Sequence, residues 1–282
     1  MRVAFLGLGL IGGSIARALR ERERGTWSVT AWTPNGDGPR AAAADGTIDV
    51  AASDPAAALR DADLVVLAAP PLDVITLLDR LGEMRSQLAP GAVITDVAST
   101  KRRIVARADE LGLAFVGGHP MAGRETTGYG AADAELFVDR PWVVCESPDA
   151  AAISWVESLA RATGARPVRM DAATHDAAVA LVSHVPLVVS AAIVEAAAAR
   201  TPAELEAALS LAAGGWAGMT RLARGDVGMG TGILATNGDL VAERLREVRA
   251  VIDAWLERLE SDDPAAIRDA FARARSILDE SQ

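Results

Sequence analysis

His119 is the residue of this sequence whose surroundings most clearly suggest chemistry. It begins the stretch His-Pro-Met-Ala-Gly, which follows a short apolar run and two glycines. Proline and glycine around it are expected to fix the shape of the loop, and an imidazole titrates close to neutral pH. A histidine held in this way can act as a general base, which typically accelerates a reaction by about 10²–10⁴-fold. The alternative is a histidine that only stabilises its loop.

A hydroxyl and an ammonium group occur together in residues 95–101, Thr-Asp-Val-Ala-Ser-Thr-Lys. Because an apolar run precedes them, Ser99 and Lys101 are expected at the carboxyl end of a strand, where ligands bind in open parallel sheets. Lys101 is the only lysine of the chain. The two groups suit hydrogen bonds to a cofactor or a substrate, although Ser99 or Thr100 would serve equally well as a helix cap.

The other two histidines lie in one long apolar segment, in the pairs His175-Asp176 and Ser183-His184. Asp176 and Ser183 are separated by about two helical turns, so we expect them to share one face of a helix. Taken singly, both histidines fit a buried core or an interface as well as they fit a binding site. No cysteine or carboxylate cluster accompanies them at metal-ligand spacing, and we therefore expect no metal.

Arg221 is a candidate for binding an anionic substrate from the second half of the chain. It follows Thr220 in a segment that begins with two glycines and a tryptophan. A guanidinium group binds a carboxylate through two parallel hydrogen bonds. The alternative is an arginine on the solvated surface.

A glycine pattern, Gly-x-Gly-x-x-Gly, follows the apolar run 3–6 and precedes a helical segment. Such glycines allow a tight turn and the close approach of a pyrophosphate, which then lies against the N-terminus of the helix. We expect a dinucleotide cofactor here, and the alternative is a glycine turn that binds nothing. The residues expected to contact the cofactor are Gly7, Gly9, Leu10, Ile11, Gly12, Ala69, Pro70 and Ser99.

The second apolar run ends at Thr33, where an NAD-selective site is expected to have an acidic residue that binds the ribose 2′-hydroxyl. Threonine can instead donate to a 2′-phosphate, and the absence of an acid removes the repulsion that excludes NADP. Arg40 is a further candidate for that phosphate. The cofactor is therefore NAD or NADP, with a lean towards NADP or the use of both, unless Thr33 only caps its strand.

These residues require a scaffold that alternates strands and helices in the first half of the chain. Continuous apolar runs at 3–6, 28–32, 64–68, 92–96, 114–116 and 142–145 are separated by helical segments, which is typical of a parallel sheet covered on both faces. The second half has helical periodicity throughout. Pro186 is expected to kink a long helix over 175–200, and Pro202 and Pro264 are expected to begin two others. We predict an α/β fold, with a Rossmann-type parallel-sheet domain at 1–170 and an all-helical domain at 171–282.

Composition narrows the class of protein further. The 282 residues carry a formal net charge of −10, which disfavours binding to nucleic acid or to an anionic membrane. The N-terminus lacks the pattern of a secretory signal, and the most apolar later segment contains too many polar groups for a membrane span. The single cysteine, Cys145, excludes an internal disulfide and favours a reducing compartment. We expect a cytoplasmic protein whose apolar helix is covered by a second subunit in a homodimer.

The order of these motifs resembles the prephenate/arogenate dehydrogenase family of tyrosine biosynthesis. The His-Pro-Met-Ala-Gly-x-Glu and Ser-His-x-Pro motifs are far more specific than the glycine pattern. The resemblance implies a Rossmann-type domain followed by a helical dimerisation domain, and the NAD(P)-dependent oxidative decarboxylation of prephenate. The matching stretches are residues 7–14, Thr95-Asp96 with Ser99 and Lys101, residues 118–123 with Glu125, Leu136-Phe137, His175-Asp176, Ser183-His184-Val185-Pro186, and Thr220-Arg221 with Asn237.

The resemblance also implies roles for individual residues. His119 would polarise or deprotonate the ring hydroxyl of the substrate, and Ser99 would hold that hydroxyl and orient the histidine. Arg221 would bind a substrate carboxylate, and Glu125 would lie at the entrance of the site. The residues implied to line the cleft between the domains are Asp176, Ser183 and His184.

Three positions depart from the family pattern, and all of them concern the substrate. Leu187 stands where the family usually has a second histidine, Gly230 where it often has a tryptophan, and Arg124 where a small hydroxyl residue is common. These changes suggest an altered pocket for the carboxylate or the side chain of the substrate, with Arg124 as a further binding residue. Prephenate, arogenate and an amino-deoxy relative of prephenate all stay open.

Two other functions remain as alternatives. A dehydrogenase of β-hydroxy acids or imines would be expected to use a lysine of the helical domain, whereas the one lysine of this chain lies in the first domain. A catalytically silent dinucleotide-binding protein would need none of His119, Ser99 and Arg221. We therefore expect an enzyme.

Overall fold

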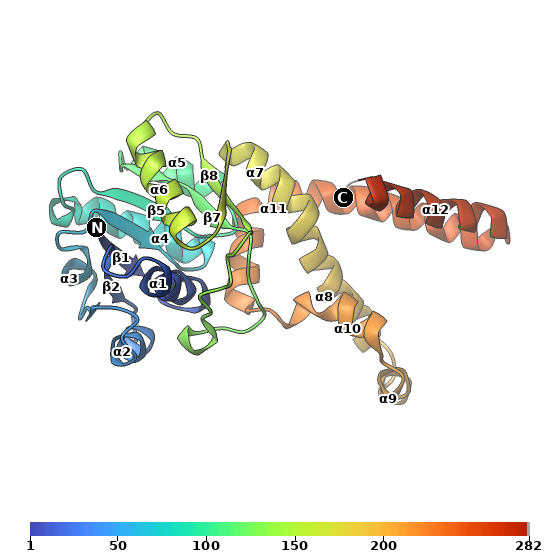
Figure 1. Ribbon diagram of the computed structural model, residues 1–282. Helices are drawn as coiled ribbons and strands as arrows, with labels where there is room; N and C mark the ends of the chain where they lie inside the picture. The colour runs from blue at the N-terminus through green and yellow to red at the C-terminus, as the bar shows by residue number, and fades with distance from the viewer. Residues whose placement is uncertain (281–282) are drawn as a thin grey trace. The chain divides into compact units, whose positions relative to one another are not determined.

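A six-stranded parallel sheet forms the first part of the chain in the computed structural model, which describes residues 1–280. The strand order is β3-β2-β1-β4-β5-β6, and β1, β2 and β5 of this sheet are labelled in Figure 1. Leu6 of β1 pairs with Trp32 of β2 and with Leu67 of β4, so the carboxyl ends of these three strands meet at one edge. The strands are β1 (Arg2–Leu6), β2 (Ser28–Trp32), β3 (Val50–Ala51), β4 (Leu64–Leu67), β5 (Val93–Asp96) and β6 (Phe115–Val116). The predicted α/β architecture is confirmed.

Helices cover both faces of this sheet, as its continuous apolar strands require. Successive side chains of a strand point to opposite faces, so Phe5 packs with α1, α2 and α6, while Leu6 packs with α3, α4 and α5. Aspartate side chains cap two of the helices: Asp54 accepts from Ala57 N–H, and Asp149 accepts from Ala152 N–H. The helices are α1 (Leu10–Arg22), α2 (Asp37–Ala44), α3 (Pro55–Leu59), α4 (Pro71–Glu83), α5 (Arg102–Glu110) and α6 (Ala150–Ala162), with short 3₁₀ turns at η1 (Arg85–Gln87) and η2 (Tyr129–Ala131).

A second sheet of three strands holds the chain around His119. It consists of β7 (Gly118–Pro120), β8 (Pro141–Cys145) and β9 (Arg166–Met170), with β7 antiparallel and β9 parallel to β8. Two expectations were therefore wrong in detail. The run at 142–145 belongs to this sheet and not to the parallel one, and His119 lies on a short strand opposite Val143 rather than in a loop.

The second half of the described chain is helical, as predicted. Its first helical segment is α7 (Ala172–Val179), a π-helical turn η3 (Ala180–His184) and α8 (Val185–Ala198). Pro186 was expected to kink a simple helix, whereas the structure has a wider turn directly before it. Proline lacks the N–H that would bond the carbonyl four residues earlier, so the regular ladder is interrupted at this point. The later elements are α9 (Pro202–Ser210), α10 (Gly214–Thr220), η4 (Leu222–Arg224), α11 (Val227–Glu260) and α12 (Pro264–Glu280). The predicted starts at Pro202 and Pro264 are confirmed.

The chain divides into two compact units, Met1–Gly238 and Asp239–Gln282. The first unit ends within α11, where the backbone of Asn237 leaves the helical conformation at φ −134°. In the second unit, Trp255 of α11 stacks against Phe271 of α12 with ring centroids 4.9 Å apart. The expected boundary at residue 170 separates two functional domains rather than two compact units, and it stays a prediction.

Large apolar side chains stay exposed on the helices of the second half. Residues 172–198 are long and apolar enough to cross a membrane by length and composition alone, and 28% of their most apolar window is buried within the chain. Exposed patches of this kind on a folded chain indicate a surface that another molecule covers. The exposed side chains include Leu181, Val182, Val194, Val251, Leu256, Leu259 and Phe271.

Candidate active site

The glycine loop has the geometry of a phosphate cradle. Gly7 has φ +108°, and a Cβ there would lie 2.1 Å from the carbonyl oxygen of Ala68, so no other residue fits the turn. A Cβ at Gly12 would lie 2.7 Å from the carbonyl oxygen of Gly7. Gly9 is different, because a Cβ there would meet no described atom within 4 Å. The space above Gly9 is therefore open to a ligand.

The N-terminus of α1 faces that space, and no side chain of the helix caps its N–H groups. Gly9 is the N-cap residue, the helix has no side-chain cap bond, and its first turn contains no acidic residue. The N–H groups and the positive end of the helix are thus available to an anion. Leu10 and Ile11 are half-buried in this turn, as are Ala69 and Pro70, which follow the adjacent strand β4. These residues fit a dinucleotide pyrophosphate.

Thr33 lies at the neighbouring strand end, directly after the residue whose carbonyl accepts from Gly7 N–H at 2.9 Å. Its hydroxyl oxygen accepts from Gly36 N–H at 3.1 Å and lies 3.2 Å from Asn35 Oδ1. Arg40 donates to Asp37 Oδ1 at 2.5 Å and to the carbonyl of Asn35 at 3.1 Å. Thr33 and Arg40 therefore stabilise the same turn.

His119 is buried and hydrogen-bonded to a second imidazole. Its Nδ1 lies 2.8 Å from Nε2 of His175, and the rings meet edge to face with centroids 5.0 Å apart. Burial lowers the pKa of His119 well below 6.5, and the nearby His175, Lys101 and His184 lower it further. The imidazole is therefore neutral at pH 7 and can accept a proton.

Asp176 holds His175 in place. The Nδ1 of His175 lies 2.8 Å from Asp176 Oδ1, and the carboxylate also accepts from the N–H groups of Lys101 at 2.7 Å and Arg102 at 2.9 Å. Burial acts to raise the pKa of Asp176, but the hydrogen bonds from His175 and from these N–H groups together keep it below its ordinary value. A buried carboxylate, two imidazoles and the start of α5 thus form one connected cluster.

His175 was absent from the residues expected to act in the site. Adjacent residues of a helix do not face each other as a rule, so the neighbouring carboxylate of Asp176 gave little reason to single it out. The available signal was the side-by-side pair of a histidine and an aspartate in an otherwise apolar segment.

Lys101 does not face the place where a ligand was expected. Its ammonium group is fully buried and pairs with Asp96 at the end of β5. The Asp96 carboxylate also accepts from Gly118 N–H and Ala98 N–H, both at 3.0 Å. The lysine therefore ties the end of β5 to the strand that carries His119.

His184 joins the same cluster from the π-helical turn. Asn237 Nδ2 lies 3.2 Å from His184 Nδ1 and donates to the carbonyl of Asp176 at 2.9 Å. Burial lowers the pKa of His184 to about 4, and the backbone of Ser99 also faces this ring. Within the described residues, the buried Nε2 of His184 has no hydrogen-bond partner.

Ser183 does not share the buried face with Asp176. Asp176 is fully buried, whereas Ser183 is exposed. The expected spacing of two α-helical turns was wrong, because the five residues of η3 form a wider turn that changes the direction of the following side chains.

Arg221 and Glu125 form an ion pair between the helical part and the loop after His119. Arg221 follows the last residue of α10, and its side chain is 59% exposed. Arg124 instead pairs with Asp133 at 2.5 Å. The structure thus brings Glu125 to Arg221 but gives Arg124 a different partner.

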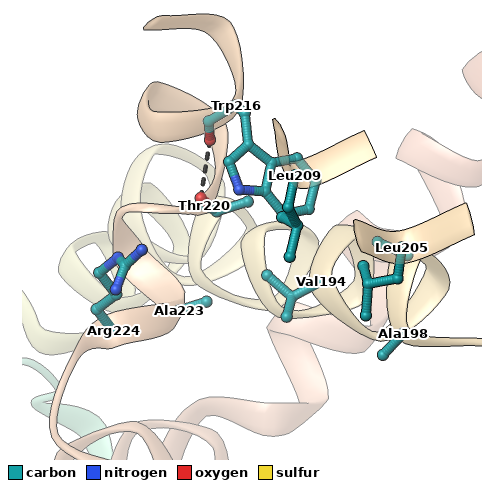
Figure 2. A pocket seen from close by; sticks show the side chains of 9 residues that line it. Val194, Ala198, Leu205, Leu209, Trp216, Thr220, Ala223 and Arg224 are labelled. Carbon is teal, nitrogen blue, oxygen red and sulfur yellow. Dashed lines mark hydrogen bonds between the residues drawn. The ribbon is translucent and has the colours of Figure 1, made fainter. Parts of the chain in front are cut away.

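A cavity of about 310 Å³ lies between α8, α9 and α10 (Figure 2). Its wall is mostly apolar, and Thr220 Oγ donates to the carbonyl of Trp216 at 2.8 Å beside it. None of the residues expected to act in catalysis or binding lines it. The lining residues are Val194, Ala197, Ala198, Leu205, Leu209, Trp216, Thr220, Ala223 and Arg224. Among residues 1–280, no group of three or more His, Cys, Asp or Glu is placed to hold a metal ion.

Comparison with known proteins identifies two domains of one enzyme family. The family described as prephenate dehydrogenase, nucleotide-binding domain, matches residues 15–169. The family described as prephenate dehydrogenase, dimerization domain, matches residues 171–273. Together they account for most of the chain.

Individual relatives agree with this match. A prephenate dehydrogenase of Bacillus subtilis (strain 168) is 30% identical over 282 residues, which is 98% of this chain and 75% of the relative. The crystal structure of Synechocystis arogenate dehydrogenase is 28% identical, with a TM-score of 0.82 and 100% of both chains covered. A structure of prephenate dehydrogenase from A. aeolicus with hydroxyphenyl propionate and NAD+ has a TM-score of 0.90 at 24% identity, over 100% of this chain and 98% of that one. This last likeness shows a common fold.

Proposed function

Because the chain belongs to the prephenate dehydrogenase family, we propose that it oxidises and decarboxylates a cyclohexadienyl acid with a nicotinamide dinucleotide, with prephenate as the first candidate substrate. The observation that carries the proposal is His119, an imidazole kept neutral by burial and held by a second buried ring. A neutral imidazole is what the reaction needs, because its first requirement is an acceptor for the hydroxyl proton.

His119 receives the ring-hydroxyl proton of the substrate at Nε2, the nitrogen that does not face His175. The bound cofactor supplies the acceptor for the hydride that leaves the hydroxyl-bearing ring carbon. The carboxylate on the opposite ring carbon leaves as carbon dioxide, and its electron pair completes the aromatic ring. The protein therefore mainly positions the reactants and manages one proton.

Five residues are proposed to bind the substrate around this base. Ser99 holds the hydroxyl, and His184 offers its unpartnered Nε2 from the same cluster. Arg221 binds a substrate carboxylate, for which it must exchange its contact with Glu125. Arg124 and Ser183 remain further candidates at the rim of the site.

NAD and NADP both remain open as cofactors, with a lean towards NADP or the use of both. The open space at Gly9 and the free first turn of α1 support a pyrophosphate at this loop. The absence of an acid at Thr33 supports acceptance of a 2′-phosphate. The ion pair of Arg40 with Asp37 argues against NADP, because that arginine already binds a carboxylate of the protein.

Arogenate is the second candidate substrate, favoured by a contact between two of the departures from the family pattern. A Cβ at Gly230 would lie 3.8 Å from Cδ2 of Leu187. The two positions are thus neighbours, and their joint change replaces polar and aromatic groups by an apolar side chain and a residue without a side chain. A different substrate side chain is the simplest cause of such a coupled change.

A homodimer through the helical domain at 171–282, beside a dinucleotide-binding domain at 1–170, completes the proposal. The limits of the two family matches support this division. The exposed apolar side chains of α8, α11 and α12 support an interface with a second copy. Light scattering at micromolar concentration tests this, since a stable monomer would contradict the dimer.

The direct test measures reduction of the nicotinamide with NAD and NADP, each crossed with prephenate and with arogenate. Turnover with one combination supports the proposal and names the substrate. Cofactor binding without turnover in any combination would contradict it and favour a silent relative or another substrate.

A further inference from the structure

Asp176, His175 and His119 form a continuous line of buried hydrogen bonds. The two links, His119 Nδ1 to His175 Nε2 and His175 Nδ1 to Asp176 Oδ1, are both 2.8 Å long. All three side chains are buried. We propose that His175 and Asp176 are positioning residues that fix the tautomer of His119 and share the positive charge it acquires, which rests on the proposed function of His119 as the base.

The direction of each bond follows from the carboxylate. An ionised Asp176 can only accept hydrogen bonds, and it already accepts from two backbone N–H groups of residues 101 and 102. His175 Nδ1 must therefore be the nitrogen that carries a proton. With one proton on each ring, His175 Nε2 is the acceptor and His119 donates to it through Nδ1. The lone pair of His119 Nε2 is thereby left for the substrate.

Asp176 is suited to this role because its position is fixed from several sides. Its carboxylate, from α7, faces the start of α5, where the N–H groups of the helix favour a negative charge. Arg102 Nε lies 3.4 Å from its second oxygen. On the other side, Asn237 donates to its backbone carbonyl and accepts from Arg102 Nη2 at 2.9 Å. An anion held by so many donors changes neither charge nor direction when the base reacts.

Proton transfer along these hydrogen bonds would move the positive charge from His119 to His175, which contacts the Asp176 carboxylate. When the substrate proton arrives at His119 Nε2, the proton on His119 Nδ1 can pass to His175 Nε2. His119 is then neutral again, and the cation is His175, in direct contact with the Asp176 carboxylate. The titratable groups that face His119 are Lys101, which is paired with Asp96, and the imidazoles of His175 and His184. Transfer places the new cation beside the Asp176 carboxylate, and the proton returns by the same route when the product leaves.

The tautomer can be measured without any assay of activity. The chain contains only three histidines, so ¹⁵N spectra of the full-length protein with labelled histidine resolve every ring. We expect His119 to carry its proton on Nδ1 and to have an unprotonated Nε2, with assignments from the loss of signals in His119→Asn. A proton on Nε2 of His119 would overturn the proposal.

Two substitutions at His175 distinguish its effect on the tautomer of His119 from its role in sharing the positive charge. His175→Phe removes the acceptor and keeps the ring volume, and we expect kcat to fall by about tenfold to a hundredfold with a loss of the single His119 tautomer. His175→Gln can still accept from Nδ1 but cannot pass a proton on, so it should restore the tautomer and recover only part of kcat. Full activity in His175→Phe would overturn the proposal.

The matched control is Asp171→Asn, the other aspartate of the same helix. Asp171 caps α7 by accepting from Ala173 and Thr174 N–H and is exposed. Because asparagine caps a helix as well as aspartate does, we expect a melting temperature close to that of the wild type, with unchanged kcat and an unchanged His119 tautomer. If His119→Asn keeps turnover, the proposed function fails, whereas the spectra still decide the tautomer. If His119→Asn loses turnover and His175→Phe does not, only the role of His175 fails.

Discussion

The ammonium group of Lys101 is buried against the carboxylate of Asp96, and this pair links two sheets. The oxygen of Asp96 that does not face the lysine accepts from Gly118 N–H, next to His119. The only lysine of the chain thus acts on the base through the backbone of β7. A role as a direct ligand for substrate would require this pair to break.

Replacement of this lysine should strongly destabilise the fold. Lys101→Met leaves the Asp96 carboxylate buried without its counterion, and we expect a loss of about 3–5 kcal/mol in the free energy of unfolding. Urea unfolding measures it. Arg107→Ala, which removes an exposed pair with Asp79, is the control and should change stability little. Equal stability of Lys101→Met and the wild type would contradict the structural role.

Two glycines of the first loop should respond differently to alanine. Gly9→Ala adds a methyl group where no described atom lies within 4 Å, so we expect the melting temperature to stay within a few degrees and the Kd for the dinucleotide to rise by at least about tenfold. Gly7→Ala meets the backbone of Ala68 and should unfold the loop. Calorimetric titration and thermal melting measure the two effects. Unchanged cofactor binding in Gly9→Ala would place the pyrophosphate elsewhere.

Buried neutral histidines should make the protein less stable in acid. The pKa of His184 is about 4 in the folded protein and near 6.5 in an unfolded chain. Between these values the unfolded chain binds a proton that the folded protein does not, so the free energy of unfolding falls as the pH falls from 6.5 to 4. The total is about 3 kcal/mol, and His119 acts in the same direction. Urea unfolding of His184→Asn should show a weaker pH dependence; parallel curves for variant and wild type would refute it.

The pH dependence of catalysis should report the buried base. The proton acceptor must be neutral, and the pKa of His119 lies well below 6.5, so kcat/KM should be constant above pH 6.5 and fall only at lower pH. His119→Asn should reduce kcat by about 10²-fold or more while dinucleotide binding stays intact. A rate that still rises between pH 6.5 and 8 would argue against His119.

Removal of Arg221 should mainly weaken substrate binding. We expect Arg221→Ala to raise KM for the substrate by about tenfold or more, which corresponds to a charge-assisted pair of about 1.5–3 kcal/mol. Arg224→Ala is the matched control, because this arginine lies in the next turn and lines the separate cavity. Steady-state kinetics distinguish them. The same KM for Arg221→Ala and the wild type would mean that the arginine serves only its contact with Glu125.

The parallel sheet could be predicted from the sequence because its strands are continuous apolar runs, such as residues 64–67, flanked by helical periodicity. The strands around His119 could not. Gly118–Pro120 is three residues long and contains proline, and Arg166–Met170 interleaves arginine with apolar residues. Hydrophobic periodicity also cannot distinguish a π-helical turn from an α-helix, which is why the direction of Ser183 was mispredicted.

Single candidates were easier to find than their connections. His119, His184 and Asp176 were identified by type and motif, and the structure brings them into one cluster. The bond between His119 and His175 joins residues 56 positions apart and depends on the register of the short strand β7. No local pattern encodes that distance.

The carboxylate of Asp176 holds the residues after position 170 against those before it. This contact is costly to break, because separating the two parts of the chain would leave a buried carboxylate without the N–H donors of residues 101 and 102. The ion pair of Arg221 with Glu125 is exposed, so solvent screens it and little free energy is needed to break it. A separation of these two parts of the chain should therefore break the contact of Arg221 with Glu125 before it breaks the hydrogen bonds of Asp176.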